Sequence, residues 1–209
     1  MKLLLLLFVL IAQLSLAQSL NDYNKERIKI DERLMLTLGS WSVANFVGSG
    51  IGWAVTEKGA AHYFHQMNVM WNTVNLGIAL PGYLKAKRSN PSLTLSETIT
   101  EQHRNEKIFL FNAGLDLMYI SAGVVLRSEA KSNQERQDQL NGFGTSLLLQ
   151  GGFLFLFDLT AHAIHNHHRK EKLMPIMDRL SMSSTGIGLK WNLDVPKSVS
   201  NLSFQTTLE

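Results

Sequence analysis

Cysteine is absent from the 209 residues of the chain, and proline occurs only 4 times. The lack of cysteine excludes a disulfide framework, a cysteine-ligated metal and a cysteine nucleophile. Charge is also scarce, because charged residues make up 18% of the chain, against roughly 25% in soluble domains. This shortage argues against an ordinary soluble enzyme, and the sequence contains no complete catalytic or nucleotide-binding motif.

The first 17 residues have the layout of a secretory signal peptide. Lys2 supplies a short positive region, residues 3–11 form an apolar run, and Ser15-Leu16-Ala17 resembles a cleavage site. The apolar run is too short to span a membrane well, so we expect cleavage after Ala17. An uncleaved anchor helix is the alternative. Residues 18–33 then form a charged N-terminal segment.

Four long windows contain almost no charge, and each is close to the roughly 20 residues that a helix needs to cross a bilayer. They are residues 34–55, 62–84, 108–126 and 143–166. We therefore predict an all-α fold, a transmembrane four-helix up-down bundle over residues 34–166. A soluble bundle with long buried helices is the alternative, but its outer faces would carry charges every three or four residues.

Two signals disagree about the orientation of this bundle. We call the side that bears Gln18 side A; it also holds the 85–107 connection and everything after His167. Most of the lysine and arginine lies on side A, which the positive-inside tendency assigns to the cytoplasm. Export behind a signal peptide assigns side A to the periplasm instead. We expect a multi-pass protein of the inner membrane with a periplasmic mature N-terminus.

Polar residues recur deep inside the predicted helices. Helical spacing places His65, Asn68, Asn72 and Asn75 on one stripe. At about 1.5 Å per residue, similar depths are reached by Asn45, Asn75, Asp116 and Asp158, with Asn112 shallower. A carboxylate in lipid is costly, so the two aspartates should face the bundle interior. These five residues are candidates for a proton or cation site, and hydrogen-bonded helix packing is the alternative.

Histidines cluster on side A, where five of the seven lie. His162 and His165 follow Asp158 by one and two helical turns, so the three side chains offer ligands for a divalent metal such as zinc or iron. His103 could join them if its segment folds back. A wet, histidine-rich helix end is the alternative interpretation.

Two further patterns indicate how the chain associates. Ser40, Ala44, Gly48 and Gly52 recur every fourth residue, a spacing that lets another transmembrane helix approach closely, as in a homo- or hetero-oligomer. Within the polar tail at 167–209, apolar residues alternate over 185–193, which predicts a short strand in need of a partner. The formal net charge of +3 suits a membrane surface, and we expect no nucleic-acid partner.

A resemblance agrees with this architecture. Tyr63-Phe64-His65-Gln66-Met67-Asn68, the following Trp71-Asn72 and Asn75, the 112–119 segment and Gly186-Ile187-Gly188-Leu189-Lys190-Trp191 resemble a family of uncharacterised small membrane proteins from Bacteroidota. The resemblance implies four membrane spans and no assigned activity. We expect a structural or accessory membrane subunit; the alternatives are a carrier or sensor for a proton, cation or metal, and a membrane-embedded metalloenzyme.

Overall fold

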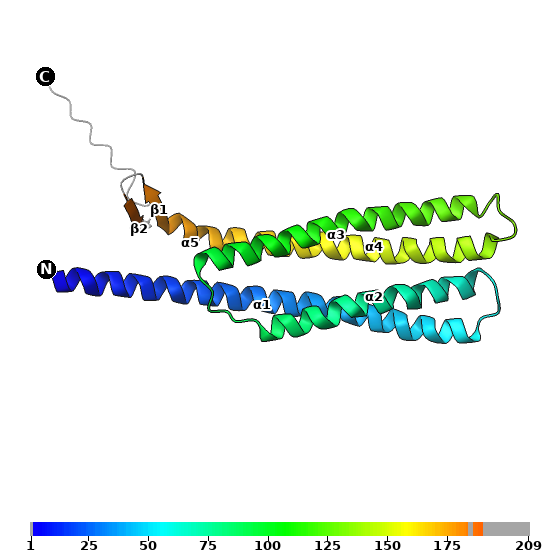
Figure 1. Cartoon of the computed structure of the whole chain (residues 1–209), viewed down its shortest axis with the longest axis horizontal. Coiled ribbons are helices and arrows are strands. Elements are labelled where there is room, and N and C mark those ends of the chain that lie inside the picture. The colour runs from blue at the N-terminus through cyan, green and yellow to red at the C-terminus, as the bar shows by residue number, and fades with distance from the viewer. Residues whose placement is uncertain (1, 184–185, 190–209) are drawn as a thin grey trace, which may run out of the picture.

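The computed structural model describes residues 2–183 and 186–189, and nearly all of them are helical. The long helices are α1 (Lys2–Val55), α2 (Ala60–Arg88), α3 (Leu95–Glu129) and α4 (Gln137–His168). They run up and down, with the α1–α2 and α3–α4 connections at one end and the α2–α3 connection at the other (Figure 1). The prediction of an all-α fold is therefore confirmed.

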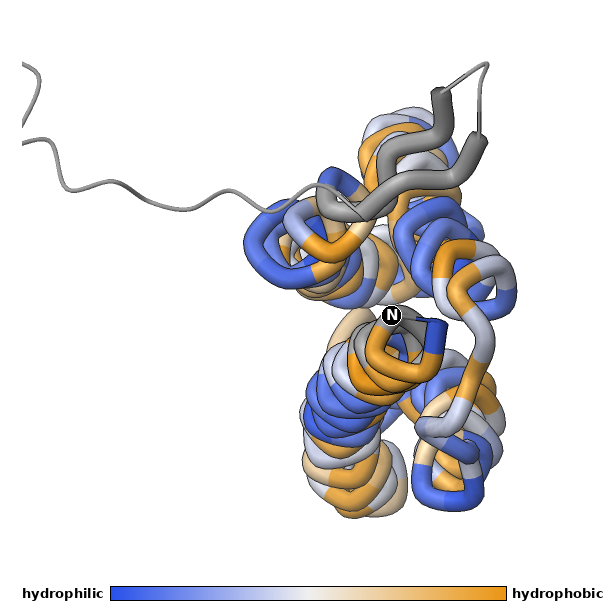
Figure 2. Tube along the Cα trace, turned by 90° about the vertical axis from the view of Figure 1, so that its left-hand side faces the viewer, coloured by the Kyte–Doolittle hydropathy of each residue, from blue (hydrophilic) through white to orange (hydrophobic). Residues whose placement is uncertain are grey.

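The bundle is assembled from two helical hairpins. Helix α1 packs along α2, and α3 packs along α4; the hairpins meet mainly where α2 contacts α4. An end-on view shows the two pairs as separate groups (Figure 2). An apolar cluster lies where all four helices come together, made of Leu34, Leu38, Ala79, Phe109, Leu154, Phe157 and Ala161. This packing leaves α2 and α3, although consecutive in the chain, largely apart along their described length.

The helices continue beyond the charge-poor windows. The charged 85–107 segment is mostly helical, because α2 runs to Arg88 and α3 begins at Leu95. A capping box fixes the start of α3: Thr94 Oγ1 accepts from the Glu97 amide, and Glu97 Oε2 accepts from the Thr94 amide. The Thr94 amide and the Thr94 hydroxyl both donate to Glu97 Oε2 at 2.8 Å, and these two hydrogen bonds lower the pKa of Glu97. The boundary of a charge-poor window is therefore not the end of a helix; the helix end is set by the capping residues.

The exterior of the bundle is apolar on every long helix. Exposed large side chains include Val47 on α1, Val74 on α2, Phe111 on α3 and Leu156 on α4. Much of the interior is polar instead, the reverse of a soluble bundle. Three segments are long and apolar enough to cross a membrane: Gln13–Val55, Leu95–Glu129 and Gln137–Asp178. Helix α2 is not among these segments, and its three asparagines, Asn68, Asn72 and Asn75, are buried.

The N-terminal part of α1 projects beyond the bundle (Figure 1). The described side chains before Leu16 are exposed, and Leu16 is the first in the chain to pack on a second apolar cluster, formed by Leu20, Tyr23 and Leu173. The predicted signal peptide thus coincides with a segment that contributes little to the packing. Its cleavage stays a prediction.

Beyond α4 the chain forms a π-helix, η1 (Arg169–Leu173), a short helix α5 (Met174–Arg179) and two strands, β1 (Leu180–Ser183) and β2 (Gly186–Leu189). The strands pair antiparallel, with Leu180 opposite Leu189 and Ser183 opposite Gly186. The first part of the predicted 185–193 strand therefore finds its partner within the same chain. Residues 190–193 of that prediction lie outside the described residues.

Candidate functional site

A hydrogen-bonded polar network joins α1, α2 and α4 inside the bundle. Asn68 Oδ1 accepts from Ser146 Oγ at 2.6 Å and from Gln150 Nε2 at 3.0 Å, while Asn68 Nδ2 donates to Ser49 Oγ at 3.2 Å. Trp41 Nε1 donates to Gln150 Oε1 at 3.0 Å. The side-chain oxygen and nitrogen of both Asn68 and Gln150 are therefore hydrogen-bonded, as expected of buried polar residues that fix helix packing.

Asn45 belongs to this network and lies apart from the aspartates. Its Oδ1 accepts from Gln150 Nε2 at 3.3 Å, and its Nδ2 donates to the Trp41 carbonyl oxygen at 2.9 Å. The similar helical depth of Asn45, Asp116 and Asp158 was therefore insufficient to bring them together. Depth fixes the level of a side chain along the bundle, whereas the rotation of each helix decides which neighbours it meets.

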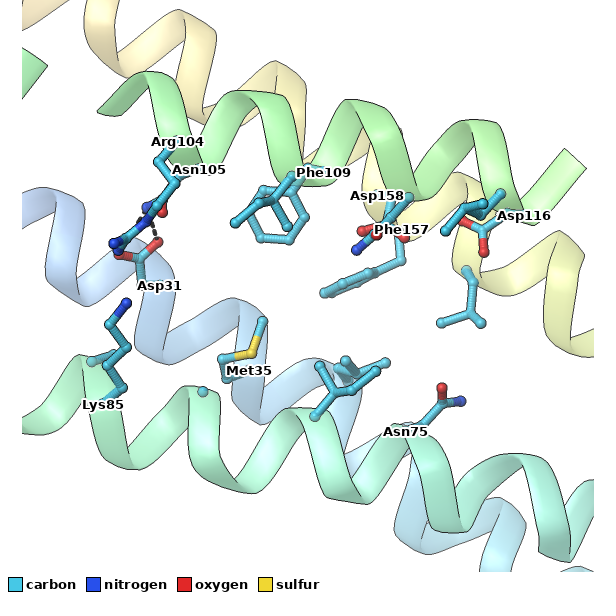
Figure 3. A pocket seen from close by; sticks show the side chains of 18 of the residues that line it. Asp31, Met35, Asn75, Lys85, Arg104, Asn105, Phe109, Asp116, Phe157 and Asp158 are labelled. Atoms are coloured by element: carbon cyan, nitrogen blue, oxygen red, sulfur yellow. Dashed lines mark hydrogen bonds between the residues drawn. The ribbon is translucent and has the colours of Figure 1, made fainter. Parts of the chain in front are cut away.

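The other four residues proposed for a proton or cation site line one cavity. This cavity has a volume of about 370 Å³, and its inner end is lined by Asn75 of α2, Asn112 and Asp116 of α3, and Asp158 of α4. Figure 3 shows Asp116 and Asp158 next to each other, with Asn75 on the opposite wall. Sequence spacing thus selected residues that the fold brings to one end of one cavity.

The two carboxyl groups are buried and close enough to interact directly. Asp116 is 3% exposed and Asp158 is 5% exposed. Asp116 Oδ2 and Trp71 Nε1 are buried without a hydrogen-bond partner among the described residues, and both residues line this cavity. An unpartnered buried acceptor or donor is costly, so Asp116 Oδ2 is a candidate to bind a proton, a cation or a water, and Trp71 Nε1 is a candidate to donate to an acceptor.

The histidines proposed as metal ligands point to different partners. His162 Nδ1 lies 3.1 Å from the Glu106 carbonyl oxygen, and His165 Nε2 lies 3.1 Å from Asp31 Oδ1. The His165 contact has ion-pair distance but poor alignment for a hydrogen bond, and the ring stacks on Phe109 with centroids 5.6 Å apart. Among the residues that the structure describes, no three His, Asp or Glu side chains gather as a metal site.

A second polar network, missed by the sequence analysis, closes the side-A end of the bundle. Tyr23 Oη donates to Gln102 Oε1 at 2.6 Å, and Gln102 Nε2 donates to Glu106 Oε1 at 2.8 Å. Arg169 Nε also reaches Glu106 Oε1 at 2.8 Å. Burial alone raises the pKa of Glu106, but the hydrogen bonds from Gln102 and Arg169 outweigh it and hold the pKa below its ordinary value.

Asp31 connects this end of the bundle to the cavity. It accepts from Asn105 Nδ2 at 2.9 and 3.1 Å, and it pairs with Arg27 at 3.4 Å. The signal that points to this network is helical periodicity within charged sequence. Thr98, Gln102 and Asn105 are spaced four and three residues apart and all turn inward on α3.

The small-residue stripe on α1 faces mainly outward. Ser40, Ala44 and Gly48 are exposed, and a Cβ at Gly48 would meet no described atom within 4 Å. Gly52 is different, because a Cβ there would collide with the His65 ring of α2. One end of the stripe therefore packs inside the bundle, and the rest is open. Its role in an oligomer stays a prediction.

Fold and site together define an all-α protein with helices suited to a membrane, an apolar exterior and an interior cavity that ends at paired carboxyl groups. The chain belongs to a family of unknown function (DUF6992), whose model matches residues 37–159. The matched segment includes the Asn68 network, Asp116 and Asp158, and it ends before His162. No curated protein and no solved structure matches the chain.

Proposed function

We propose that all four long helices cross the bilayer and that the protein is a multi-pass protein of the inner membrane. Helix α2 supports this placement because its large apolar side chains, among them Met70, Ile78 and Leu80, face outward. Its asparagines 68, 72 and 75 are buried against the other helices. A helix with that division hides its polar face from lipid even though its average composition is modest. Cleavage after Ala17 belongs to the same proposal.

We further propose that the protein acts as a membrane carrier or sensor that binds a proton or a small cation at Asp116 and Asp158. The observation that carries this proposal is the unpartnered, buried Asp116 Oδ2 beside a second buried carboxyl group. Two adjacent carboxylates in a low-dielectric interior repel each other when both are ionised. A shared proton or a bound cation removes that repulsion, which makes the pair responsive to either.

The chemistry of the donors indicates which cation fits. Asp116 and Asp158 offer carboxylate oxygens, and the amides of Asn75 and Asn112 line the same end of the cavity. Oxygen donors favour hard cations such as sodium, magnesium or calcium over zinc or iron. His162 and His165 point elsewhere, so the metalloenzyme alternative gains no support from their positions.

The test uses the full chain purified in detergent, with thermal melting as the readout. Sodium, potassium, magnesium and calcium chlorides are compared with choline chloride at constant ionic strength, each across the neutral pH range. We expect one cation, or a change in pH, to shift the melting temperature. Asp116→Asn and Asp158→Asn should each abolish that shift, whereas Asp138→Asn, an exposed carboxylate on the same helix as Asp158, should leave it intact.

Either of two results contradicts the ion-binding proposal. The first is a melting temperature that responds to neither cations nor pH. The second is a response that survives in both Asp116→Asn and Asp158→Asn. If in addition both variants are at least as stable as the parent, the pair serves only helix packing, since an amide is less costly to bury than a carboxylate.

The open part of the α1 stripe favours a second candidate function, that of an accessory subunit. Ser40, Ala44 and Gly48 leave a shallow strip on the outside of the bundle, where a helix from another copy or another protein can approach the α1 backbone. Such a role needs no chemistry in the cavity. One protein can have both functions, and different variants test them: substitutions at Asp116 and Asp158 test ion binding, and substitutions on the α1 stripe test association with another subunit.

A further inference from the structure

The cavity that ends at the carboxyl pair opens sideways between α2 and α3. Val74 and Ile78 of α2 and Ile108 of α3 line it, although their side chains are 60%, 55% and 48% exposed. Residues that line a cavity and are also exposed form its rim. In the proposed four-span placement the surroundings of this rim are lipid, so the opening faces the acyl chains of the bilayer.

The side-A end of the same cavity is basic. Arg27 of α1, Lys85 of α2 and Arg104 of α3 line it, together with the carboxylates Asp31 and Glu101. Arg27 pairs with Asp31 at 3.4 Å and Arg104 pairs with Glu101, but Lys85 forms no ion pair with any described residue. Figure 3 shows Lys85 reaching across the gap toward Asp31. Among the residues that line this end of the first cavity, three positive charges face two negative ones, and Lys85 is the cation that no carboxylate among the described residues pairs with.

A second cavity, of about 360 Å³, continues from this mouth toward the α2–α3 connection. It shares Arg27, Lys85, Ser89 and Glu101 with the first cavity and adds the carboxylate of Glu97, which accepts from the Thr94 amide and hydroxyl. The Ser89 hydroxyl and the Lys85 ammonium group lie where the two cavities join, so both groups can be reached from the aqueous end of the bundle and from its apolar middle. An amphiphile with a polar head and an apolar chain matches both compartments.

The length of the cleft matches one leaflet of a bilayer. Asn75 at the inner end and Lys85 at the mouth are ten residues apart on α2, or about 15 Å along a helix axis. That is half of the roughly 30 Å hydrocarbon core. Lys85 directly follows the charge-poor window 62–84, so it lies at the level of the head groups. Between these levels the lining is mainly apolar and includes Met35, Ile78 and Phe109.

We infer that the cleft between α2 and α3 is a binding site for an anionic membrane lipid that enters from the bilayer. The head group, a phosphate or carboxylate, binds at Lys85 with Ser89 and Arg104, and one acyl chain lies along the apolar wall toward Trp71. This inference rests on the proposed membrane placement but requires no ion at Asp116 and Asp158. A free carboxylate or phosphate from water would use the same mouth but leave the apolar wall empty.

The experiment uses Trp71 as a reporter of the cleft. The full chain is reconstituted in mixed vesicles of phosphatidylglycerol and phosphatidylcholine, with brominated acyl chains on one lipid or the other. The difference in quenching between the parent and Trp71→Phe isolates the contact of this indole with each lipid. We expect Trp71 to be quenched preferentially by the anionic lipid. Lys85→Gln should reduce this preference roughly fivefold, the effect of one cation at a membrane surface.

Lys87→Gln is the matched control, because Lys87 lies on the same turn, is exposed, and rests over the Tyr83 ring without lining either cavity. Its effect should be small. An equal loss in both variants overturns the inference, since it would report general attraction to the surface. Equal quenching by both lipids in the parent also overturns it. So does loss of the preference when soluble glycerol phosphate is added, which would identify a water-borne anion as the ligand.

The failure of this inference is distinguishable from failure of the proposed function. If Trp71 is not quenched while the other indoles are, the cleft excludes lipid although the protein is embedded. If no indole is quenched, the membrane placement itself is wrong. Asp116→Asn should abolish the cation response and leave the lipid preference unchanged, because the preference for an anionic head group is set by Lys85 at the mouth, whereas Asp116 lies at the inner end of the cavity.

Discussion

Gln150 of α4 donates a hydrogen bond of 3.0 Å to Asn68 of α2, and both side chains are fully or almost fully buried. The same Gln150 amide accepts from Trp41 and donates to Asn45, both on α1. One glutamine thus holds three helices in register. Asp116 Oδ2, by contrast, has no hydrogen-bond partner among the described residues, which separates it from the polar groups that hold the helices together.

Replacement of this glutamine is expected to destabilise the bundle. Gln150→Ala removes three hydrogen bonds and leaves Trp41 Nε1 without its acceptor, which should lower the free energy of unfolding by about 1–3 kcal/mol. The measurement is the melting temperature of the purified protein in detergent. Gln134→Ala, at an exposed position in the α3–α4 connection, is the control. A Gln150→Ala protein as stable as the control would refute the structural role of the network.

The closest approach of α4 to α2 depends on a glycine. A Cβ at Gly142 would collide with the Ala60 carbonyl oxygen and would lie 2.7 Å from both the Phe64 amide nitrogen and Tyr63 Cβ. Backbone atoms cannot move aside cheaply, so Gly142→Ala should cost about 1–3 kcal/mol through overpacking. Gly152→Ala, on the same helix, meets no described atom within 4 Å and should be neutral or stabilising. Equal melting of the two variants would contradict this crossing geometry.

The sequence was sufficient to place the long helices and the two aspartates, because charge depletion and helical spacing are local properties. The charge-poor windows lie within α1, α2, α3 and α4, and spacing selected Asn75, Asn112, Asp116 and Asp158, which line one cavity. Asn45 was grouped with them by depth alone. Its actual partner, Gln150, is 105 residues away, and the rotation of α1 that brings them together depends on packing of the whole bundle.

The mouth of the cleft could not be predicted once residues 85–107 were taken as a loop. Their charges favoured a connection, but Thr94 and Glu97 form a capping box, a signal of helix initiation that is readable in sequence. Recognition of that signal would have placed Gln102, Asn105 and Glu106 on an inward-facing helix. The divergence of α2 from α3 has no local signal, since it results from each helix packing better elsewhere.

The side-A network predicts a dependence of stability on acid. The pKa of Glu106 is held below its ordinary value, so the unfolded chain binds more protons at this residue than the folded one. Its contribution to stability is therefore present above the ordinary pKa of 4.5 and is lost as pH falls through the lower, folded value. Glu106→Gln should lower the melting temperature at neutral pH and weaken the acid dependence. Glu135→Gln, exposed in the α3–α4 connection, should change neither.

The exposed stripe on α1 predicts self-association that a bulky residue disrupts. Gly48→Leu should shift the protein toward monomer in crosslinking or sedimentation in detergent, because a large side chain prevents close helix approach. Gly77→Leu on α2 is the matched control, since that position is also exposed and a Cβ there meets no described atom within 4 Å. If the parent is already monomeric, or if both variants dissociate alike, the stripe has no role in self-association.

The absence of cysteine makes the number of spans directly measurable, because each introduced cysteine is the sole thiol of the chain. Lys58→Cys, Ser92→Cys and Lys131→Cys place one thiol in each connection between the long helices, at exposed positions. A membrane-impermeant maleimide then reports which connections are outside. Four spans require Lys58→Cys and Lys131→Cys to label alike and Ser92→Cys to label oppositely.

A different pattern would follow if α2, the long helix that is not among the three segments apolar enough to cross a membrane, lay outside the membrane. Lys58→Cys and Ser92→Cys would then label from the same side, with Lys131→Cys opposite, and the cleft between α2 and α3 would face water.

The same labels decide the orientation. Access to Ser92→Cys from the periplasm would mean that export by a signal peptide determines the topology. Access from the cytoplasm would mean that the lysine and arginine excess on side A, which includes Lys85 and Arg104, determines it instead.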